Sequence, residues 1–178
     1  MHVPQSHTHM HSTKIAVNTH LAGAAGTFAG AVVSRLYGGK TDVIMMLNGA
    51  LAGLVAITAE PLTPNPITAM LIGAIGAVIM YFGTKMLENF GLDDVVGAIP
   101  VHMFAGIFGT LVVPLTNGDT SFATQLIGVI SVCIFSFILS FGTFKALSMT
   151  IGLRISKEAE KLGTDKAEIG VVAYSIRD

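Results

Sequence analysis

A single imidazole, His102, lies in the first half of an uncharged run from Val95 to Gly118. The run has 24 residues, and a helix rising about 1.5 Å per residue needs about 20 residues to cross the roughly 30 Å hydrocarbon core of a bilayer. We therefore expect His102 inside a membrane. An ionisable group there usually faces a bundle interior, a proton relay or a water-filled path. The alternative is a neutral histidine that is hydrogen-bonded to a neighbouring hydroxyl or carbonyl.

A second stretch with polar groups in an apolar setting is MLNGALAGLVAITA, residues 46–59. Asn48 would be unusual on a lipid-facing surface, and Gly49 and Gly53 form a G-x-x-x-G face that lets a neighbouring helix approach closely. We assign a packing role to these three residues and to Gly106. The hydroxyl of Thr58 could line a path, or it could bond back to its own helix.

The first 14 residues hold four histidines, His2, His7, His9 and His11. Alternate histidines on a polar segment can bind a transition metal through imidazole nitrogens. No cysteine or carboxylate accompanies them to fix a coordination geometry. We therefore predict a disordered polar terminus over residues 1–14, with a metal site at His7, His9 and His11 as the alternative.

The composition is that of a membrane protein. Of the 178 residues, 52% are hydrophobic and 12% charged, against about 25% charged in a typical soluble domain. A net charge of −1 and the lack of a basic cluster exclude a nucleic-acid surface. No nucleophile and base occur at a spacing that predicts an enzyme, and Cys133, the one cysteine, cannot form an internal disulfide.

Uncharged segments separated by charged or Pro- and Gly-containing loops predict an all-α, polytopic protein with about five transmembrane helices. The expected spans are about 15–34, 43–59, 66–84, 95–116 and 120–148, within a transmembrane domain of residues 15–151. Residues 152–178 alternate acids and bases, which is typical of a solvated tail.

The lysines and arginines predict the orientation of this domain. Five spans leave nine of these residues on the side of the C-terminal tail and only Lys14 on the other. Because cytoplasmic loops carry the excess of Lys and Arg, we expect the tail in the cytoplasm and the N-terminus outside. His20 then lies near the outer interface.

Three stretches resemble one known family. VNTHLAGAAG (residues 17–26), the string from Asn48 to Ala59, and DDVVGAIPVHMFAGIFGT (residues 93–110) are similar to the ammonium transporter/methylammonium permease (Amt/Rhesus) family, as is the start of the tail, GLRISKEAEKLG (152–163). The chain departs from the family at Glu60-Pro61, where glycine or cysteine would follow, and at Met103, where a small glycine is usual. Thr164 and Ile169 replace a leucine and a histidine of the tail.

The resemblance implies two inverted five-helix repeats plus a final helix, with a conducting path at their interface. This chain matches the last five spans and the tail. His102 matches the second of two pore histidines, which are thought to deprotonate ammonium, and Thr58 matches a hydroxyl near the pore. Neutral imidazole accepts one hydrogen bond, donates another and takes up protons near neutral pH, so it suits this task.

The resemblance further implies ammonium or ammonia as the substrate, a homotrimer, no cofactor and a cytoplasmic regulator at the tail. The other pore histidine and the cation-recruiting groups belong to earlier spans without a counterpart here. We therefore expect the C-terminal part of a transporter, as a fragment or a split half. The alternative is a non-conducting ammonium-sensing or interaction module, which Met103 favours because it would narrow the pore.

Overall fold

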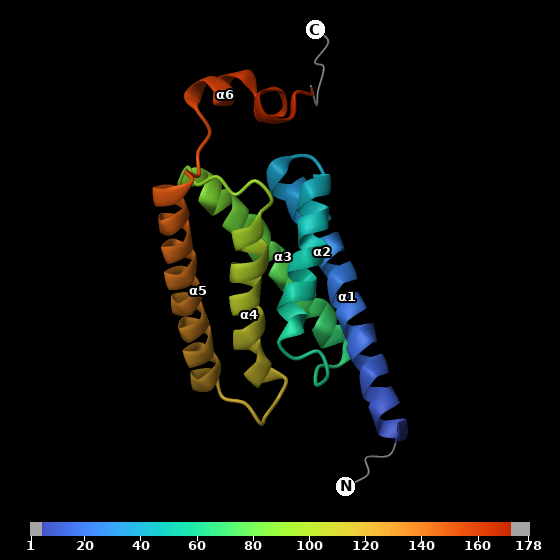
Figure 1. Cartoon of the computed structure of the whole chain (residues 1–178). Coiled ribbons are helices and arrows are strands. Elements are labelled where there is room, and N and C mark those ends of the chain that lie inside the picture. Colours follow the sequence, from blue (N-terminus) through green and yellow to red (C-terminus); the bar gives the residue numbers. More distant parts are fainter. Residues whose placement is uncertain (1–4, 172–178) are drawn as a thin grey trace. The chain divides into compact units, whose positions relative to one another are not determined.

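The computed structural model describes residues 5–171, and in this range every regular element is a helix (Figure 1). The predicted all-α class is confirmed. The elements, in chain order, are α1 (Gln5–Gly38), α2 (Val43–Thr58), α3 (Pro66–Asn89), the π-helical segment η1 (Ile99–Phe104), α4 (Ala105–Val112), the 3₁₀ turn η2 (Val113–Leu115), α5 (Phe122–Thr150), α6 (Lys157–Leu162) and the π-helical turn η3 (Asp165–Ile169).

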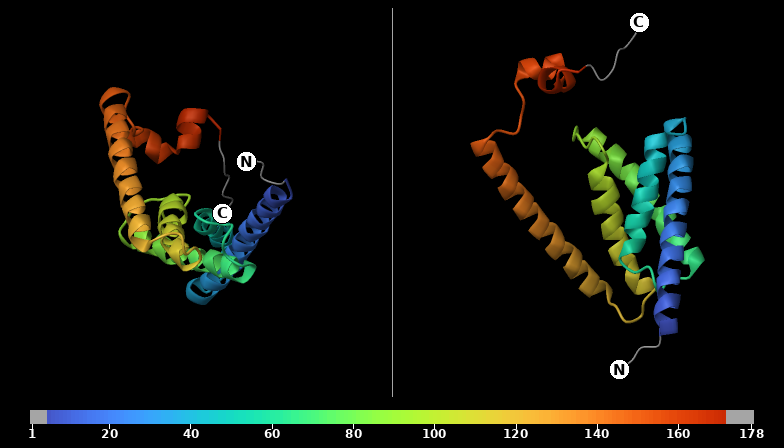
Figure 2. Two further views of the ribbon diagram at one scale, coloured as in Figure 1. Left: turned by 90° about the horizontal axis from the view of Figure 1, so that it is seen from below. Right: turned by 45° about the vertical axis from the view of Figure 1, so that its right-hand side comes forward.

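The chain divides into two compact units, Met1–Ser131 and Val132–Asp178. In the first unit, α1, α2 and α3 pack against one another, and η1 and α4 pack against α2 and α3 (Figures 1 and 2). The core of this unit contains small side chains together with Ile57, Met80, Tyr81 and Val101.

Local sequence signals fix the starts of α2 and α3. The Asp42 carboxylate accepts hydrogen bonds from the backbone N–H groups of Ile44, at 2.8 Å, and Met45, at 3.2 Å. Asn65 accepts one from Thr68, at 2.9 Å, and Pro66 occupies the first turn of α3. Both are N-cap arrangements, because the first N–H groups of a helix have no partner within it.

Glycines bring α1 into backbone contact with two neighbours. A Cβ placed on Gly49 or Gly53 of α2 would meet the backbone of Gly26 or Ala22 of α1. A Cβ on Gly73 of α3 would also collide with the backbone of Ala22. Such close approach provides van der Waals contact between helices in lipid, where burial of apolar groups gives little driving force for association.

Polar side chains fasten the loop between α2 and α3. The amide Nδ2 of Asn18, on α1, donates to the carbonyls of Pro61 and Pro64, both at 2.9 Å. A Glu60 carboxylate oxygen accepts from Asn117 Nδ2 at 3.1 Å, which ties this loop to the turn after η2. Buried loop backbone needs such partners, because an unpaired carbonyl is costly away from water.

Helix bounds differ from the expected spans at several points. α1 begins at Gln5, so residues 5–14, expected in a disordered terminus, continue the first helix. The fourth expected span, 95–116, is helical only from Ile99 to Leu115, and it is divided into η1, α4 and η2. Pro100 and Pro114 lack the N–H of a regular helix, which accounts for the irregular turns around them.

Two of the helices, α3 and α5, are long and apolar enough to cross a membrane, with mean hydropathies of 1.9 and 2.3. The segments Val43–Thr58 and Ile99–Leu115 are apolar but shorter.

The second unit contains most of α5, then α6 and η3. No residue of α5 is buried within the chain. The Ser156 hydroxyl caps α6 by accepting from Ala159 N–H at 3.1 Å, and Arg154 pairs with Glu160 at 2.7 Å. These charges lie in the segment expected to be a solvated tail.

The backbone contact of α1 with α3 predicts that Gly73→Ala destabilises the protein. Overpacking costs about 1–3 kcal/mol and exceeds the gain of about 1 kcal/mol in helix propensity. Denaturant titration of the detergent-solubilised chain, followed by circular dichroism, measures the change. Gly128→Ala is the control, because a Cβ there meets nothing within 4 Å. A Gly73→Ala protein as stable as the control would contradict the packing.

Candidate functional site

His102 lies in η1 with its side chain exposed, while its neighbours Pro100 and Val101 are buried against the bundle. Within residues 5–171, no other residue forms a hydrogen bond with the imidazole. The π-helical turn thus packs its proline and valine inward and leaves both ring nitrogens available to a ligand.

The backbone of η1 is irregular at the histidine itself. The N–H of Ala105 is shared between the carbonyls of His102 and Pro100. Pro100 has no N–H to contribute to the helix, so the chain widens by one residue at this turn. π-Helical turns of this kind occur frequently at functional sites, because they direct a side chain away from the regular helix face.

Two side chains hold the start of η1. The carboxylate of Asp94 accepts from the N–H of Ala98 through one oxygen and from that of Ile99 through the other, both at 2.8 Å. From α2, the amide nitrogen of the buried Asn48 side chain donates to the carbonyl of Val96 at 3.1 Å. Asp94 and Asn48 therefore fix the segment from which His102 extends.

Gly97 allows Asn48 to reach this backbone. Its φ is +73°, a conformation that side chains rarely adopt, and a Cβ there would lie 2.8 Å from Asn48 Nδ2. The turn before η1 therefore requires glycine for both backbone conformation and space. Asn48, assigned to helix packing, is 8% exposed and bonds to this turn.

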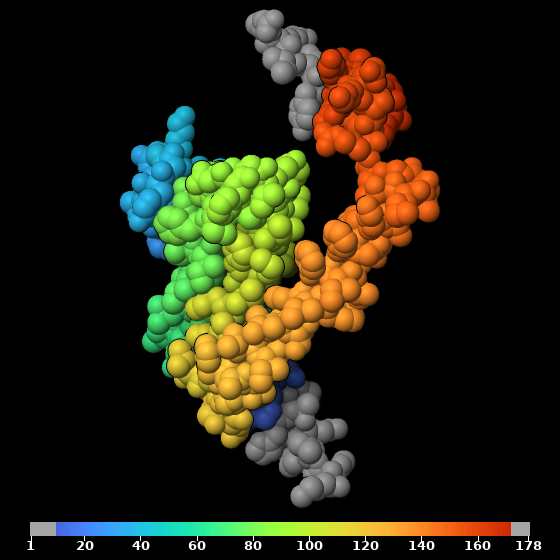
Figure 3. Space-filling model, turned by 90° about the vertical axis from the view of Figure 1, so that its left-hand side faces the viewer, coloured from blue at the N-terminus to red at the C-terminus, as the bar shows by residue number. Residues whose placement is uncertain are grey.

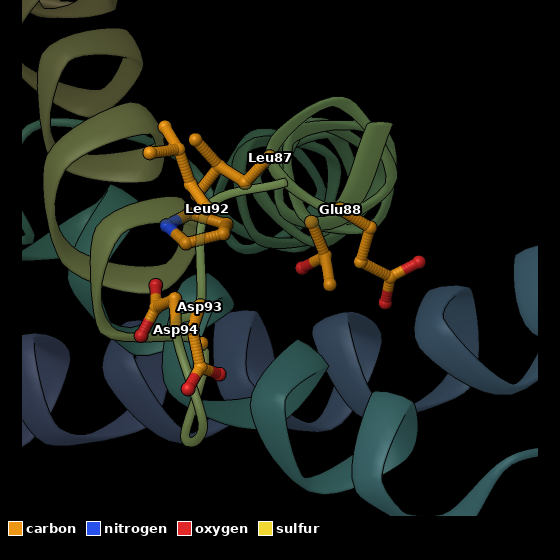
Figure 4. Close-up of a pocket in the computed structure, with 8 residues that line it drawn as sticks. Leu87, Glu88, Leu92, Asp93 and Asp94 are labelled. Atoms are coloured by element: carbon orange, nitrogen blue, oxygen red, sulfur yellow. The ribbon is translucent and has the colours of Figure 1, made fainter. Parts of the chain in front are cut away.

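A cavity of about 160 Å³ lies beside the same turn (Figure 4). Leu87 and Glu88 of α3 line it together with Leu92, Asp93 and Asp94 of the following loop. Asp94 is engaged with the N–H groups of η1, whereas no hydrogen bond to the Asp93 side chain is present in the described part of the chain. The cavity borders the elements that position His102.

Figure 3 shows one face of the first unit, where the loop after α3, η1 and α4 (green to yellow) form a continuous surface. On α4, a Cβ on Gly109 would collide with the backbone of Ala56. At Gly106 the nearest atom would be a Val55 methyl at 3.6 Å, an ordinary contact. The closest approach of α4 to α2 is therefore at Gly109, and Gly106 is not required for it.

The remaining residues expected at a site are Thr58 and the N-terminal histidines, and those that the structure describes are exposed. The Thr58 hydroxyl is exposed and donates to the Leu54 carbonyl at 2.6 Å, the helix back-bond considered above. The side chains of His7 and His9 lie outside the described residues, and His11 is exposed. In the described part of the chain, no group of three or more His, Cys, Asp or Glu residues could hold a metal ion.

A bundle of apolar helices that pack through glycine, with an irregular helical segment presenting a histidine, defines a multi-pass helical membrane protein. The sequence profile of the Ammonium Transporter Family matches residues 3–174, and the chain belongs to this family. The family expected from the sequence motifs is thereby confirmed.

Individual proteins of this family are similar to most of the chain. The ammonium transporter Amt2 of Archaeoglobus fulgidus is 42% identical over 90% of this chain and 38% of its own length. The ammonium transporter of Bacillus subtilis is 30% identical over 89% of this chain and 43% of its own length. The chain thus spans about 40% of the length of the curated relatives it matches.

Solved structures share the fold. A structure described as a sensor Amt protein has a TM-score of 0.80 and 28% identity, over 88% of this chain and 42% of that chain. Candida albicans Mep2 has a TM-score of 0.77 and 26% identity, over 90% of this chain and 40% of the Mep2 chain. The partial ammonium-transporter fold predicted from the sequence is confirmed by these matches.

The positioning residues of the site were not identified from the sequence. Asp94, Gly97 and Gly109 were not singled out. The signals were present, since an aspartate shortly before an apolar helix is a cap candidate and a glycine between the two permits positive φ.

The capping role of Asp94 predicts that Asp94→Ala loosens η1. Loss of a cap costs about 1 kcal/mol, which corresponds to roughly fivefold faster amide exchange across the segment. Hydrogen–deuterium exchange of residues 98–104, followed by mass spectrometry, measures this change in exchange rate. The adjacent Asp93→Ala removes an equal charge without removing a bond to η1. Equal exchange in the two variants would refute the capping role.

Proposed function

We propose that this chain forms part of a path for ammonium or ammonia across a membrane, with His102 as a pore histidine. The observation that carries the proposal is an exposed imidazole to which no residue within 5–171 is hydrogen-bonded, in a chain whose relatives are named ammonium transporters. An imidazole in a lipid-facing position would be costly, and this favours a polar path beside it.

The chemistry follows from what distinguishes ammonium from potassium, a cation of similar size. Ammonium donates hydrogen bonds and can lose a proton, so a selective path can use an acceptor that also takes up a proton. Neutral imidazole accepts at one nitrogen and donates at the other. In the proposed path, His102 accepts a hydrogen bond or proton from the substrate, and η1 holds the ring in place.

The path requires a second wall. The chain covers about 40% of the length of its relatives, and in this fold class the substrate site lies between two repeats. We propose that the remaining wall is supplied by the rest of a transporter, on the same or a separate polypeptide, within a homotrimer. The surface bearing His102 would then face the path.

A second candidate function is ammonium sensing without conduction, acting through the cytoplasmic tail. One of the similar structures is described as a sensor Amt protein. Met103, 43% exposed, directly follows the proposed pore histidine and would narrow a path there. Ammonium-dependent protection of tail amides from hydrogen exchange, without uptake, would favour this function.

The transport proposal predicts that His102→Ala abolishes methylammonium uptake. The chain is placed in the matching region of Archaeoglobus fulgidus Amt2, and the chimera is expressed in cells without ammonium transporters of their own. We expect uptake by the unmodified chimera and background uptake by His102→Ala, because the acceptor for the substrate is lost. His20→Ala is the control, since its ring is exposed and its Nδ1 contacts the Ala16 carbonyl of its own helix. Uptake unaffected by His102→Ala would exclude the pore role.

The proposed orientation places the α1–α2 turn in the cytoplasm and the α2–α3 loop outside. In a Cys133→Ala background, a membrane-impermeant maleimide should label Thr63→Cys in intact cells, and Thr41→Cys only after permeabilisation. Both threonines are exposed in the structure. The reverse labelling pattern would show that the orientation is wrong.

A further inference from the structure

A second cavity, of about 350 Å³, lies in the first unit at the turn between α1 and α2. Its lining comes from the end of α1, the turn, the start of α2 and the last part of α3: Ser34, Gly38, Lys40, Thr41, Asp42, Met45, Tyr81 and Lys85. The volume falls in the range of small-molecule pockets, which is about 300–1,000 Å³. This cavity has no residue in common with the one beside η1.

Tyr81 brings an unpartnered donor to the cavity. Its side chain is 3% exposed, and within residues 5–171 no hydrogen bond to its hydroxyl is present. The hydroxyl lies 3.4 Å from the position that a Cβ on Gly38, another lining residue, would occupy. Its oxygen keeps some accessible surface, so the hydroxyl can donate a hydrogen bond to a ligand in the cavity.

Two ammonium groups provide positive charge. In the described part of the chain, Lys40 forms no ion pair, and Lys85 pairs only with Glu88, at 2.9 Å, where both side chains are about half exposed. The one carboxylate in the lining, Asp42, already accepts two N–H groups at the start of α2, where the helix dipole favours its negative charge. The cavity therefore suits an anion with several acceptor oxygens.

The surface beside the cavity is aromatic and apolar. Tyr37 is 68% exposed and contacts Phe82, which is 45% exposed, edge to face at a centroid distance of 5.1 Å. Tyrosines beside lysines mark the interface of a bilayer, where the rings lie at headgroup depth. An acyl chain could follow this surface while a phosphate occupies the cavity.

We propose that this cavity is a phosphate site that binds the headgroup of an anionic phospholipid. Lys40 and Lys85 contribute charge, and the Tyr81 hydroxyl donates a hydrogen bond to a phosphate oxygen. Basic pockets between transmembrane helices bind acidic lipid headgroups on the cytoplasmic side, and the Lys and Arg distribution assigns this end of the bundle to that side.

Lipid binding to the full chain tests the proposal. Native mass spectrometry in detergent compares phosphatidylglycerol with phosphatidylcholine, and a parallel titration with inorganic phosphate identifies a soluble ligand. We expect phosphatidylglycerol to bind preferentially. Lys40→Ala and Tyr81→Phe should each weaken binding about tenfold, because each removes a bond to a charged group.

Matched variants separate the site from general effects. Lys14→Ala removes a lysine charge far from the cavity lining. This variant should bind lipid like the unmodified chain, whereas Thr41→Glu, which adds a carboxylate to the lining, should weaken binding without changing the helix content. Phosphate binding with the same dependence on Lys40 and Tyr81 would support the site with a soluble ligand. Equal binding of both lipids and no binding of phosphate, or binding unchanged in Lys40→Ala and Tyr81→Phe, would overturn it.

Discussion

The close approach of α1 to α2 and α3 is the contact on which the first unit depends. Gly49 and Gly53 place α2 against the backbone of α1, and Gly73 does the same for α3. In a bilayer the lipid is as apolar as the side chains, so association depends on van der Waals contact and on hydrogen bonds between helices. η1 and α4 then pack against both α2 and α3, and α4 approaches the Ala56 backbone of α2 at Gly109.

Hydrogen bonds from a few polar side chains then fix the two ends of the bundle. Asn18 and Glu60 hold the loop between α2 and α3, while Asn48 and Asp94 hold the turn before η1. Asn18, Asn48 and Asp94 bond to backbone groups of the loops and turns, whereas Glu60 bonds to the Asn117 side chain. Polar residues in the apolar segments therefore shape the loops, whereas the imidazole of His102 forms no hydrogen bond within residues 5–171.

Charge is distributed unequally between the loops of the bundle. The α1–α2 turn and the end of α3 carry Lys40 and Lys85 beside the buried ring of Tyr81, whereas the α2–α3 loop carries Glu60 and several prolines. In the proposed orientation these lysines face the cytoplasmic membrane surface, which supplies anionic phosphates, so they can also contribute to a binding site. Orientation and lipid recognition would thus depend on the same residues.

The sequence by itself determined the all-α class and the family, and it singled out His102, whose role stays a prediction. The class and the family depend on composition and on contiguous motifs, which are local. The tertiary structure decided that η1 is π-helical, that Gly109 and not Gly106 makes the close contact, and that Tyr81 and Lys40 line one cavity. Helices that are apolar on nearly every face carry little periodic signal to fix their rotation. Those features therefore depend on contacts between residues distant in the chain, which spacing along one segment does not specify.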